Sequence, residues 1–144
     1  MPDPSSPALS CPCGARTPRG ALLPYADCCA RYHDGPLALQ APTPEALMRS
    51  RYSAFVLDRR DVLLATWHAS TRPAEIEPPE PGLKWLGLEV RGSGLADADH
   101  GWVEFVARSK LGGRAHRLHE RSRFVREPAG EGGRWFYVDG QIAG

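Results

Sequence analysis

All four cysteines of the chain lie in one short stretch near its start. They form two pairs, Cys11 with Cys13 and Cys28 with Cys29, within CPCGARTPRGALLPYADCC. Four thiolates can hold one Zn²⁺ in a closed tetrahedral site that leaves no position for a substrate. Gly14 directly follows the C-x-C pair and supplies the backbone freedom that such a tight chelate turn needs. The stretch therefore predicts a structural zinc site.

The adjacent pair, Cys28 and Cys29, demands a special backbone. Successive side chains of an extended segment point apart, so both sulfurs reach one ion only where the chain is kinked, for instance at the first turn of a helix. His33 is the substitute ligand if this geometry fails for either cysteine. Zinc contributes about 10 to 16 kcal/mol, whereas ordering each residue of the stretch costs about 1 to 2 kcal/mol. We therefore expect this knuckle to pack against the domain that follows it.

Two other thiol chemistries compete with zinc. Structural disulfides require an oxidising compartment, and the first ten residues, MPDPSSPALS, contain neither the basic nor the apolar region of a signal peptide. A redox-active pair needs a lowered thiol pKa, and neither cysteine pair shows the helix-start context that lowers it. The sequence therefore favours zinc and a cytoplasmic location.

Length and composition describe an ordinary globular chain. Its 144 residues, 42% of them hydrophobic, fit one domain with a small appendage. A net charge of +1 favours neither nucleic acid nor an anionic membrane as partner, and no apolar run is long enough for a membrane span. We expect a disordered lead-in over residues 1–10 and the zinc knuckle over residues 11–35.

Helical spacing begins after a short linker. Thr43 can cap a helix that has Pro44 in its first position. Apolar residues then recur at helical intervals, at Met48, Tyr52, Phe55 and Val56. Asp61 can cap a second helix, in which Trp67 belongs to the buried stripe and His68 lies at the C-terminal edge.

Downstream, the pattern changes to strand-forming residues separated by glycines. Four strands are expected, at residues 83–91, 101–110, 114–127 and 134–139. The turn signals between them are Gly92 with Gly94, Gly112 with Gly113, and Gly130 with Gly132 and Gly133. Helices followed by a strand meander predict an α+β domain over residues 43–140, with the helices on one face of an antiparallel sheet and a pocket between them.

The third strand brings a carboxylate toward this pocket. Alternation places Glu120 and Ser122 on the face that we expect to be internal. An unpaired buried carboxylate is costly, so Glu120 should have a partner, for which Arg51 and His68 are the best candidates. The aromatic walls would come from Tyr52, Trp67 and Trp85.

This candidate pocket has two interpretations. Glu120 and His68 could act as an acid/base pair on a small apolar ligand. Alternatively, a buried charge pair fixes the first helix against the sheet, with the aromatic residues as core. We favour the second interpretation, because a fold does not by itself imply an activity, and we assign no catalytic residue.

Several motifs resemble those of one family, in the family's order. CPCG followed by paired cysteines is similar to the SEC-C zinc motif. EALMRSRYSAF, LLATWHASTRP, LHERSRF and RWFYVDG resemble the YchJ family, in which a SEC-C motif precedes a cone-shaped, nuclear-transport-factor-2-like domain. The match covers nearly the whole chain after residue 10 and implies zinc ligands at Cys11, Cys13, Cys28 and Cys29. The chain departs from the family in having Ala15-Arg16 in place of Ser-Gly and a longer loop before Cys28.

The resemblance also suggests a role. SEC-C motifs are similar to protein-docking modules, and here Arg16, Arg19 and Arg31 would be presented to the partner. We expect a cytoplasmic, zinc-binding interaction module with a protein or ribonucleoprotein partner; the alternative is a small-ligand binder or enzyme that uses the candidate pocket. A second basic group crowds the C-terminal half, at Arg114, Arg117, Arg121, Arg123, Arg126 and Arg134. Glutamates interleave with it, which favours an ordinary exposed strand face over a nucleic-acid surface.

Overall fold

Helices precede strands along the chain, as the sequence predicts. The computed structural model describes residues 10–143. The elements are a 3-10 turn η1 (Tyr25–Asp27), helices α1 (Ala30–His33), α2 (Pro44–Val56) and α3 (Arg60–Ala65), and strands β1 (Lys84–Asp97), β2 (His100–Leu111), β3 (Arg114–Glu127) and β4 (Arg134–Ile142). The expected α+β class is confirmed. The expected lead-in, residues 1–10, lies outside the described residues apart from Ser10.

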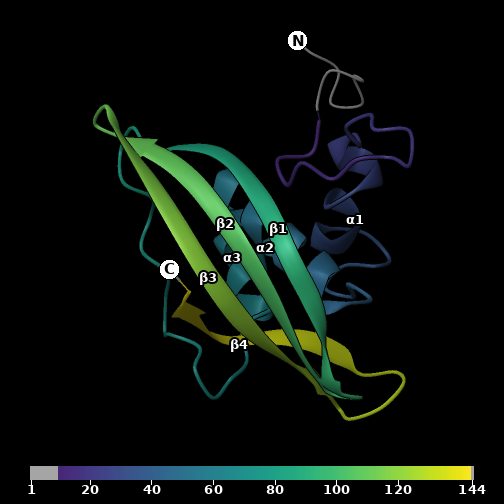
Figure 1. Ribbon diagram of the computed structural model, residues 1–144. Helices are drawn as coiled ribbons and strands as arrows, with labels where there is room; N and C mark the ends of the chain where they lie inside the picture. The colour runs from purple at the N-terminus through teal and green to yellow at the C-terminus, as the bar shows by residue number, and fades with distance from the viewer. Residues whose placement is uncertain (1–9, 144) are drawn as a thin grey trace.

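The four strands form one antiparallel sheet in the order β1-β2-β3-β4. Figure 1 shows β1, β2 and β3 as long bent strands in front of α2 and α3, with β4 crossing below them. Register shifts interrupt β1 between Trp85 and Gly87, between Val90 and Gly92, and again near its end. Such bulges bend a strand and increase its twist, so the sheet curves around the helices and leaves space between them.

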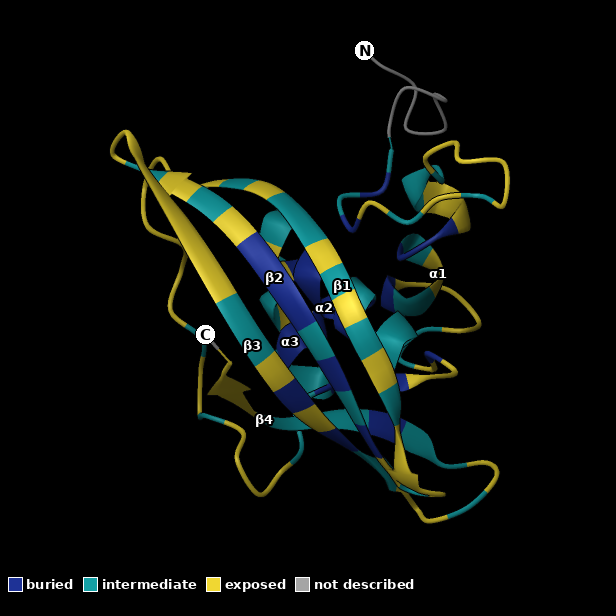
Figure 2. Ribbon diagram, in the orientation of Figure 1, coloured by how far each residue is buried: buried dark blue, intermediate teal, exposed yellow. Residues whose placement is uncertain are grey.

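Helix α2 packs most of its length against the sheet. Its start follows the predicted cap: the Thr43 hydroxyl accepts a hydrogen bond from the Ala46 amide at 3.0 Å, and Pro44 is the first helical residue. Leu47 and Tyr52 belong to the same core as the β2 residue Phe105. Figure 2 shows this buried strip along the middle of β2 and on the facing side of α2.

Helix α3 is shorter than the sequence predicts. Arg59, not Asp61, occupies its N-cap position, without a capping hydrogen bond from the side chain, and the helix ends at Ala65, so Trp67 and His68 lie beyond it. The segment instead runs beside β4: the Tyr137 amide donates to the Thr66 carbonyl at 2.8 Å, and the His68 amide donates to the Tyr137 carbonyl at 2.7 Å. Residues 66–68 therefore form backbone hydrogen bonds with β4 instead of continuing α3 by another turn.

The first strand is longer than predicted, and Gly92 and Gly94 are not turn residues. Both lie inside β1, which continues to Asp97. The Trp102 ring of β2 lies over them: a Cβ atom at Gly94 would be 3.1 Å from Trp102 Nε1. These glycines make room for a large neighbouring side chain instead of reversing the chain.

The knuckle lies at the β1 edge of the sheet and against α2. A Cβ atom on Gly14 would be 3.9 Å from the Leu88 carbonyl oxygen in β1, and all four cysteines share one core cluster with Leu47 and Met48. The expectation that the knuckle packs on the following domain is confirmed. Among residues 10–143, no helix is long and apolar enough to cross a membrane.

Candidate metal centre

The first cysteine pair lies on a small hairpin. The Cys11 amide donates to the Leu23 carbonyl at 2.9 Å, and isolated bridges join Ser10 to Pro24 and Arg16 to Leu22. The turn itself is closed by the Gly14 amide, which donates to the Cys11 carbonyl at 3.1 Å. Gly14 has φ of 76°, the left-handed conformation that favours glycine. The predicted need for backbone freedom after the C-x-C pair is confirmed.

The second pair occupies the junction of two short helical turns. Cys28 ends η1 with φ of −129° and ψ of −115°, and Cys29 is the N-cap of α1 with φ of −64° and ψ of −26°. This abrupt change of backbone conformation is the kink that two adjacent ligands require. It also corrects one expectation, because Cys29 does stand at the start of a helix, although that helix has only four residues.

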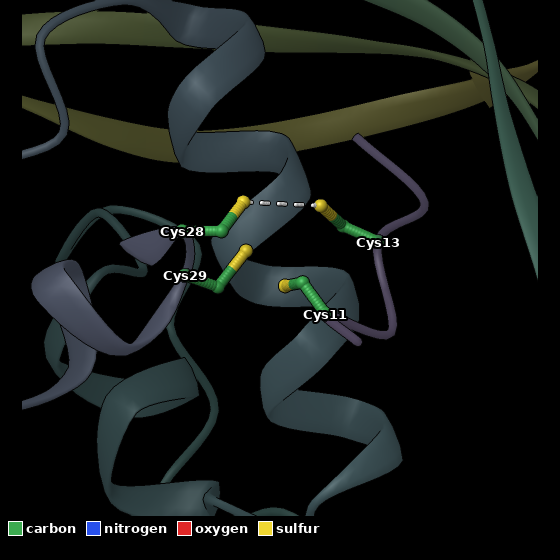
Figure 3. A group of neighbouring side chains, drawn as sticks. All are labelled: Cys11, Cys13, Cys28 and Cys29. Carbon is green, nitrogen blue, oxygen red and sulfur yellow. Dashed lines mark hydrogen bonds between the residues drawn. The ribbon is translucent and has the colours of Figure 1, made fainter. Parts of the chain in front are cut away.

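The four sulfur atoms converge on one point. Figure 3 shows Cys11 and Cys13 approaching from one side and Cys28 and Cys29 from the other. All four Sγ atoms lie within 4.8 Å of one another, and the Cys13 and Cys28 sulfurs are 3.6 Å apart. A tetrahedral site with Zn–S bonds of about 2.3 Å has sulfurs about 3.8 Å apart, whereas a disulfide requires about 2.05 Å. The cluster of buried free thiols could therefore bind a metal ion.

The thiols strongly perturb one another's ionisation. Hydrogen bonds with Cys13, Cys28 and Cys29 lower the pKa of Cys11. For Cys13, hydrogen bonding to Cys11 raises the pKa and bonding to Cys28 and Cys29 lowers it, with a net value of about 7. The pKa values of Cys28 and Cys29 are both raised, chiefly by their hydrogen bonds to Cys11. Four thiolates at this spacing therefore require a cation to balance their charge.

His33 has other partners than the sulfurs. Its Nε2 donates to the Ser50 carbonyl oxygen at 2.7 Å, so its Nδ1 accepts from the Tyr25 hydroxyl at 2.6 Å. Burial raises the pKa of Tyr25 to about 12, which keeps that hydroxyl protonated. The substitution of His33 for a cysteine ligand is therefore not needed, and the ring instead fixes α1 to α2.

Helix α2 supports the cysteine cluster directly. The Ser53 hydroxyl lies 3.4 Å from the Cys11 sulfur, and Arg49 Nη1 donates to the Cys13 carbonyl at 3.0 Å. Arg49 is itself held by an ion pair of 3.0 Å with Glu45. The first cysteine pair, although far from α2 in sequence, is thus held by side chains of this helix.

The structure brings most of the candidate pocket residues together. A cavity of about 190 Å³ between α2 and the sheet is lined by the predicted Arg51, Tyr52, Trp67, Trp85, Glu120 and Ser122, together with Met48, Phe55, Phe105, Ala107, Leu118 and Tyr137. His68 is not among these residues. Its ring lies elsewhere, with Nε2 2.9 Å from the Glu127 carboxylate and Nδ1 2.7 Å from the Ser70 hydroxyl.

The predicted partners of Glu120 are both wrong. Its carboxylate accepts a hydrogen bond from the Ser122 hydroxyl at 2.8 Å, and among the described residues it forms no ion pair with Arg51 or His68. The reason for the His68 error is the early end of α3, which sends this residue along β4 toward Glu127. An acid/base pair of Glu120 and His68 is therefore not formed.

Arg51 is the most deeply buried charge of the cavity. Only 3% of its surface is exposed, and its Nη1 donates to the Leu63 carbonyl at 2.8 Å and to the Thr66 hydroxyl at 2.7 Å. Its guanidinium carbon lies 4.4 Å from the Tyr137 ring centroid and 5.1 Å from that of Trp67. Burial lowers the pKa of Arg51 to about 10. The sequence prediction missed Tyr137, although alternation along RWFYVDG places it on the same sheet face as Trp135.

The two basic groups differ in their pairing. Arg16, Arg19 and Arg31 are all exposed on the knuckle. In the C-terminal half, Arg123 pairs with Asp139 and Arg126 with Asp99, while the Arg121 guanidinium lies 4.0 Å from the Trp102 ring centroid. The second group is thus partly neutralised.

Sequence comparisons find close relatives along the whole chain. A family described as "YchJ, middle NTF2-like domain" matches residues 43–140. A UPF0225 protein from Methylibium petroleiphilum is 64% identical over 99% of this chain and 95% of its own length. A UPF0225 protein from Bordetella pertussis is 58% identical, with 97% of each chain covered.

Two solved structures are similar in fold. The crystal structure of a SEC-C motif-containing protein from Psychrobacter arcticus has a TM-score of 0.74 at 31% identity, covering 94% of this chain and 83% of that one. The solution structure of a SEC-C motif-containing protein from Rhodopseudomonas palustris has a TM-score of 0.71 at 32% identity, covering 94% and 99%.

Proposed function

The chain belongs to the YchJ family of UPF0225 proteins with an NTF2-like domain, and from this premise we propose that its SEC-C-type knuckle holds one structural Zn²⁺ through Cys11, Cys13, Cys28 and Cys29. The observation that carries the proposal is the convergence of four buried sulfurs within 4.8 Å of one another. Zinc is the ion that such a four-thiolate set favours.

The zinc serves structure and not substrate chemistry. Four cysteine ligands fill a tetrahedral coordination sphere and leave no position open. The ion joins the hairpin around Cys11 to the helical junction at Cys28. Arg49 and Ser53 attach the hairpin to α2 through their contacts with Cys13 and Cys11. Reduced thiols suit a cytoplasmic location, where disulfides are rare.

We assign to the ordered knuckle the task of binding another macromolecule, a protein or ribonucleoprotein. Its surface presents Arg16, Arg19 and Arg31 as exposed cations. One large apolar side chain of the knuckle is exposed, Leu22 at 44%, and Leu37, two residues beyond the knuckle, is exposed at 50%. Cations around exposed apolar groups fit an acidic partner surface with an apolar centre.

Metal analysis tests the zinc proposal. The full chain, prepared under reducing conditions, should carry one equivalent of zinc, and Cys11→Ser or Cys28→Ser should lose it. His33→Gln is the matched control, because it alters a buried neighbour of the cluster that is not a ligand, and it should retain zinc. Stoichiometric zinc in both cysteine variants, or zinc loss only in His33→Gln, would show that the ligand set is wrong.

Site-specific crosslinking tests the interaction proposal. A photoreactive residue at Arg19 should capture a discrete partner in cells, and the double variant Arg16→Glu with Arg31→Glu should abolish this capture. A photoreactive residue at Arg114, which is exposed at the far turn of the sheet, is the control. Equal capture from both positions, or none from Arg19, would contradict binding through the knuckle.

A further inference from the structure

The cavity between α2 and the sheet combines aromatic walls with a buried cation. Tyr52 and Trp85 meet edge to face with ring centroids 5.6 Å apart, and Trp67 and Tyr137 do the same at 5.2 Å. Phe55, which is 38% exposed, and Leu118, which is 40% exposed, lie where the lining reaches the surface. The cavity is therefore a space with aromatic walls and access from solvent.

Hydrogen-bond donors remain unused around this space. A guanidinium has five N–H donors, yet within residues 10–143 the hydrogen bonds of Arg51 come from Nη1 alone. Among the described residues, Trp67 Nε1 is the one fully buried side-chain nitrogen without a hydrogen-bond partner, so the free N–H groups of Arg51 keep some accessible surface whereas the indole N–H of Trp67 does not. Leaving buried donors unpaired is unfavourable, so this end of the cavity is suited to a group that accepts hydrogen bonds.

The Glu120 carboxylate of β3 is a hydrogen-bond acceptor on the sheet side of the same cavity. The Glu120 carboxylate accepts one hydrogen bond, from Ser122, although a carboxylate can accept several. It packs against the backbone of Gly140, where a side chain would displace it. Glu120 is thus held in place as an acceptor for a donor group inside the cavity.

The charges of the cavity compensate one another. Arg51 contributes one positive charge and Glu120 one negative charge, with no direct ion pair between them among the described residues. An anionic ligand would gain from Arg51 but be repelled by Glu120, and a cation would experience the reverse. A neutral ligand with an acceptor and a donor side by side satisfies both groups.

From these features we propose that the cavity binds one uncharged aromatic ring bearing a primary amide or an equivalent acceptor–donor pair. The acceptor faces the Arg51 guanidinium, and the donor faces the Glu120 carboxylate. The volume of about 190 Å³ admits a single ring, because an apolar protein cavity of about 150 Å³ binds benzene. The proposal concerns binding, because His68, the expected acid/base partner of Glu120, lies outside the cavity and contacts Glu127 instead.

Benzamide is the probe, with benzoate as an anion of the same shape. Each is titrated into ¹⁵N-labelled, zinc-loaded full-length protein while the four indole N–H resonances are followed. Benzamide should shift the Trp67 and Trp85 resonances saturably and leave Trp102 and Trp135, which do not line the cavity, unchanged. Benzoate should bind about tenfold more weakly, because it offers Glu120 a second negative charge in place of a hydrogen-bond donor.

Glu120→Gln tests the charge argument. Removing this negative charge should strengthen benzoate binding about tenfold, because Arg51 then attracts the anion without opposition, and should weaken benzamide binding, because its donor loses a charged acceptor. Glu131→Gln, an exposed change in the turn before β4, is the control and should alter neither affinity.

Three outcomes would overturn the proposal. The first is an absence of saturable benzamide shifts in folded wild-type protein, and the second is benzoate binding at least as tightly as benzamide. The third is an unchanged preference in Glu120→Gln. The first two comparisons use the wild-type chain alone, so the proposal remains testable if the variant does not fold. Zinc content is measured in each sample, which separates this result from the fate of the knuckle proposal.

Discussion

Arg49 of α2 donates a hydrogen bond of 3.0 Å to the carbonyl oxygen of Cys13, 36 positions earlier in the chain. The arginine lies between the cysteine loop on one side and Glu45 on the other, with which it forms an i,i+4 ion pair. The cysteine segment and the α+β domain are therefore joined by a polar contact as well as by their shared apolar core.

Removing the Arg49 contact should loosen the cysteine loop. Arg49→Met is expected to lower the free energy of unfolding by about 1 kcal/mol, since it leaves the Cys13 carbonyl without this donor. It should also speed zinc transfer to a coloured chelator. Glu45→Gln is the control, because it removes the charge of the helix-surface pair, worth about 0.3 to 0.5 kcal/mol, and keeps an amide oxygen that can accept from Ser93 of β1. Equal zinc-transfer rates in the two variants would show that the Cys13 contact does not stabilise the site.

Zinc removal should unfold the knuckle locally and spare the sheet. The hairpin amides of Cys11 and Gly14 are held by few hydrogen bonds, whereas β2 and β3 pair along their whole lengths. Stripping the metal removes about 10 to 16 kcal/mol of binding free energy from the knuckle. Hydrogen exchange after chelation should therefore rise in residues 10–33 and remain slow in β2 and β3. Loss of protection in both regions at once would contradict independent stability of the sheet.

Much of the fold and the site follows from local sequence signals. The Thr43 cap, the position of Pro44 and the β3 bounds are confirmed, since each depends on residues near one another in sequence. The clustering of the cysteines was predictable because few chemistries explain four thiols in one stretch. We expected the cysteine segment to pack on the following domain. The spacing of residues did not identify Arg49 or Ser53 as the side chains of α2 that contact Cys13 and Cys11.

The errors arise where tertiary contacts override local pattern. Trp67 and His68 continue a helical spacing, yet backbone pairing with Tyr137 ends α3 before them. Gly92 and Gly94 look like turn residues, but the indole of Trp102 requires space inside the strand. In each case the decisive contact is with a strand residue that is not a sequence neighbour, Tyr137 of β4 in the first and Trp102 of β2 in the second. The sequence alone does not show which residues these strands place opposite the segment.

A pair of acidic residues should make stability depend on pH. Hydrogen bonds from Arg59 lower the pKa values of both Asp34, after α1, and Asp61, in α3. A carboxyl group with a lowered folded-state pKa stabilises above its unfolded pKa of about 3.9, and this stabilisation is lost as pH falls through the folded value. Because both carboxylates are exposed, the effect at neutral pH should be at most about 1 kcal/mol.

Urea denaturation of wild type and Arg59→Gln at a series of pH values measures this effect. The difference in unfolding free energy between the two proteins should be constant near neutral pH and shrink below about pH 4. Added salt should reduce it at neutral pH by screening. Taking the difference removes the common effect of acid on the thiolates. A difference that grows on acidification would show that the Arg59 contacts do not stabilise the fold.

The two glycines beneath Trp102 provide a matched pair of substitutions. A Cβ atom at Gly92 would meet the Trp102 ring at 3.4 Å, an ordinary contact, whereas at Gly94 it would lie 3.1 Å from Nε1 and 3.3 Å from two further ring atoms. Alanine restricts the unfolded chain more than glycine does, so Gly92→Ala should stabilise by about 0.4 to 1 kcal/mol. Gly94→Ala should instead destabilise by about 1 kcal/mol, because the ring must move within a packed sheet face.

Thermal unfolding and the Trp102 indole resonance distinguish the two variants. A change of 1 kcal/mol corresponds to a shift in Tm of about 2 to 8 °C for domains of this size range, so opposite shifts are measurable. Only Gly94→Ala should move the Trp102 resonance, because only there is the ring displaced from the Arg121 guanidinium, 4.0 Å from its centroid. If both variants gain stability and neither moves this resonance, then Gly94 is not needed to accommodate Trp102.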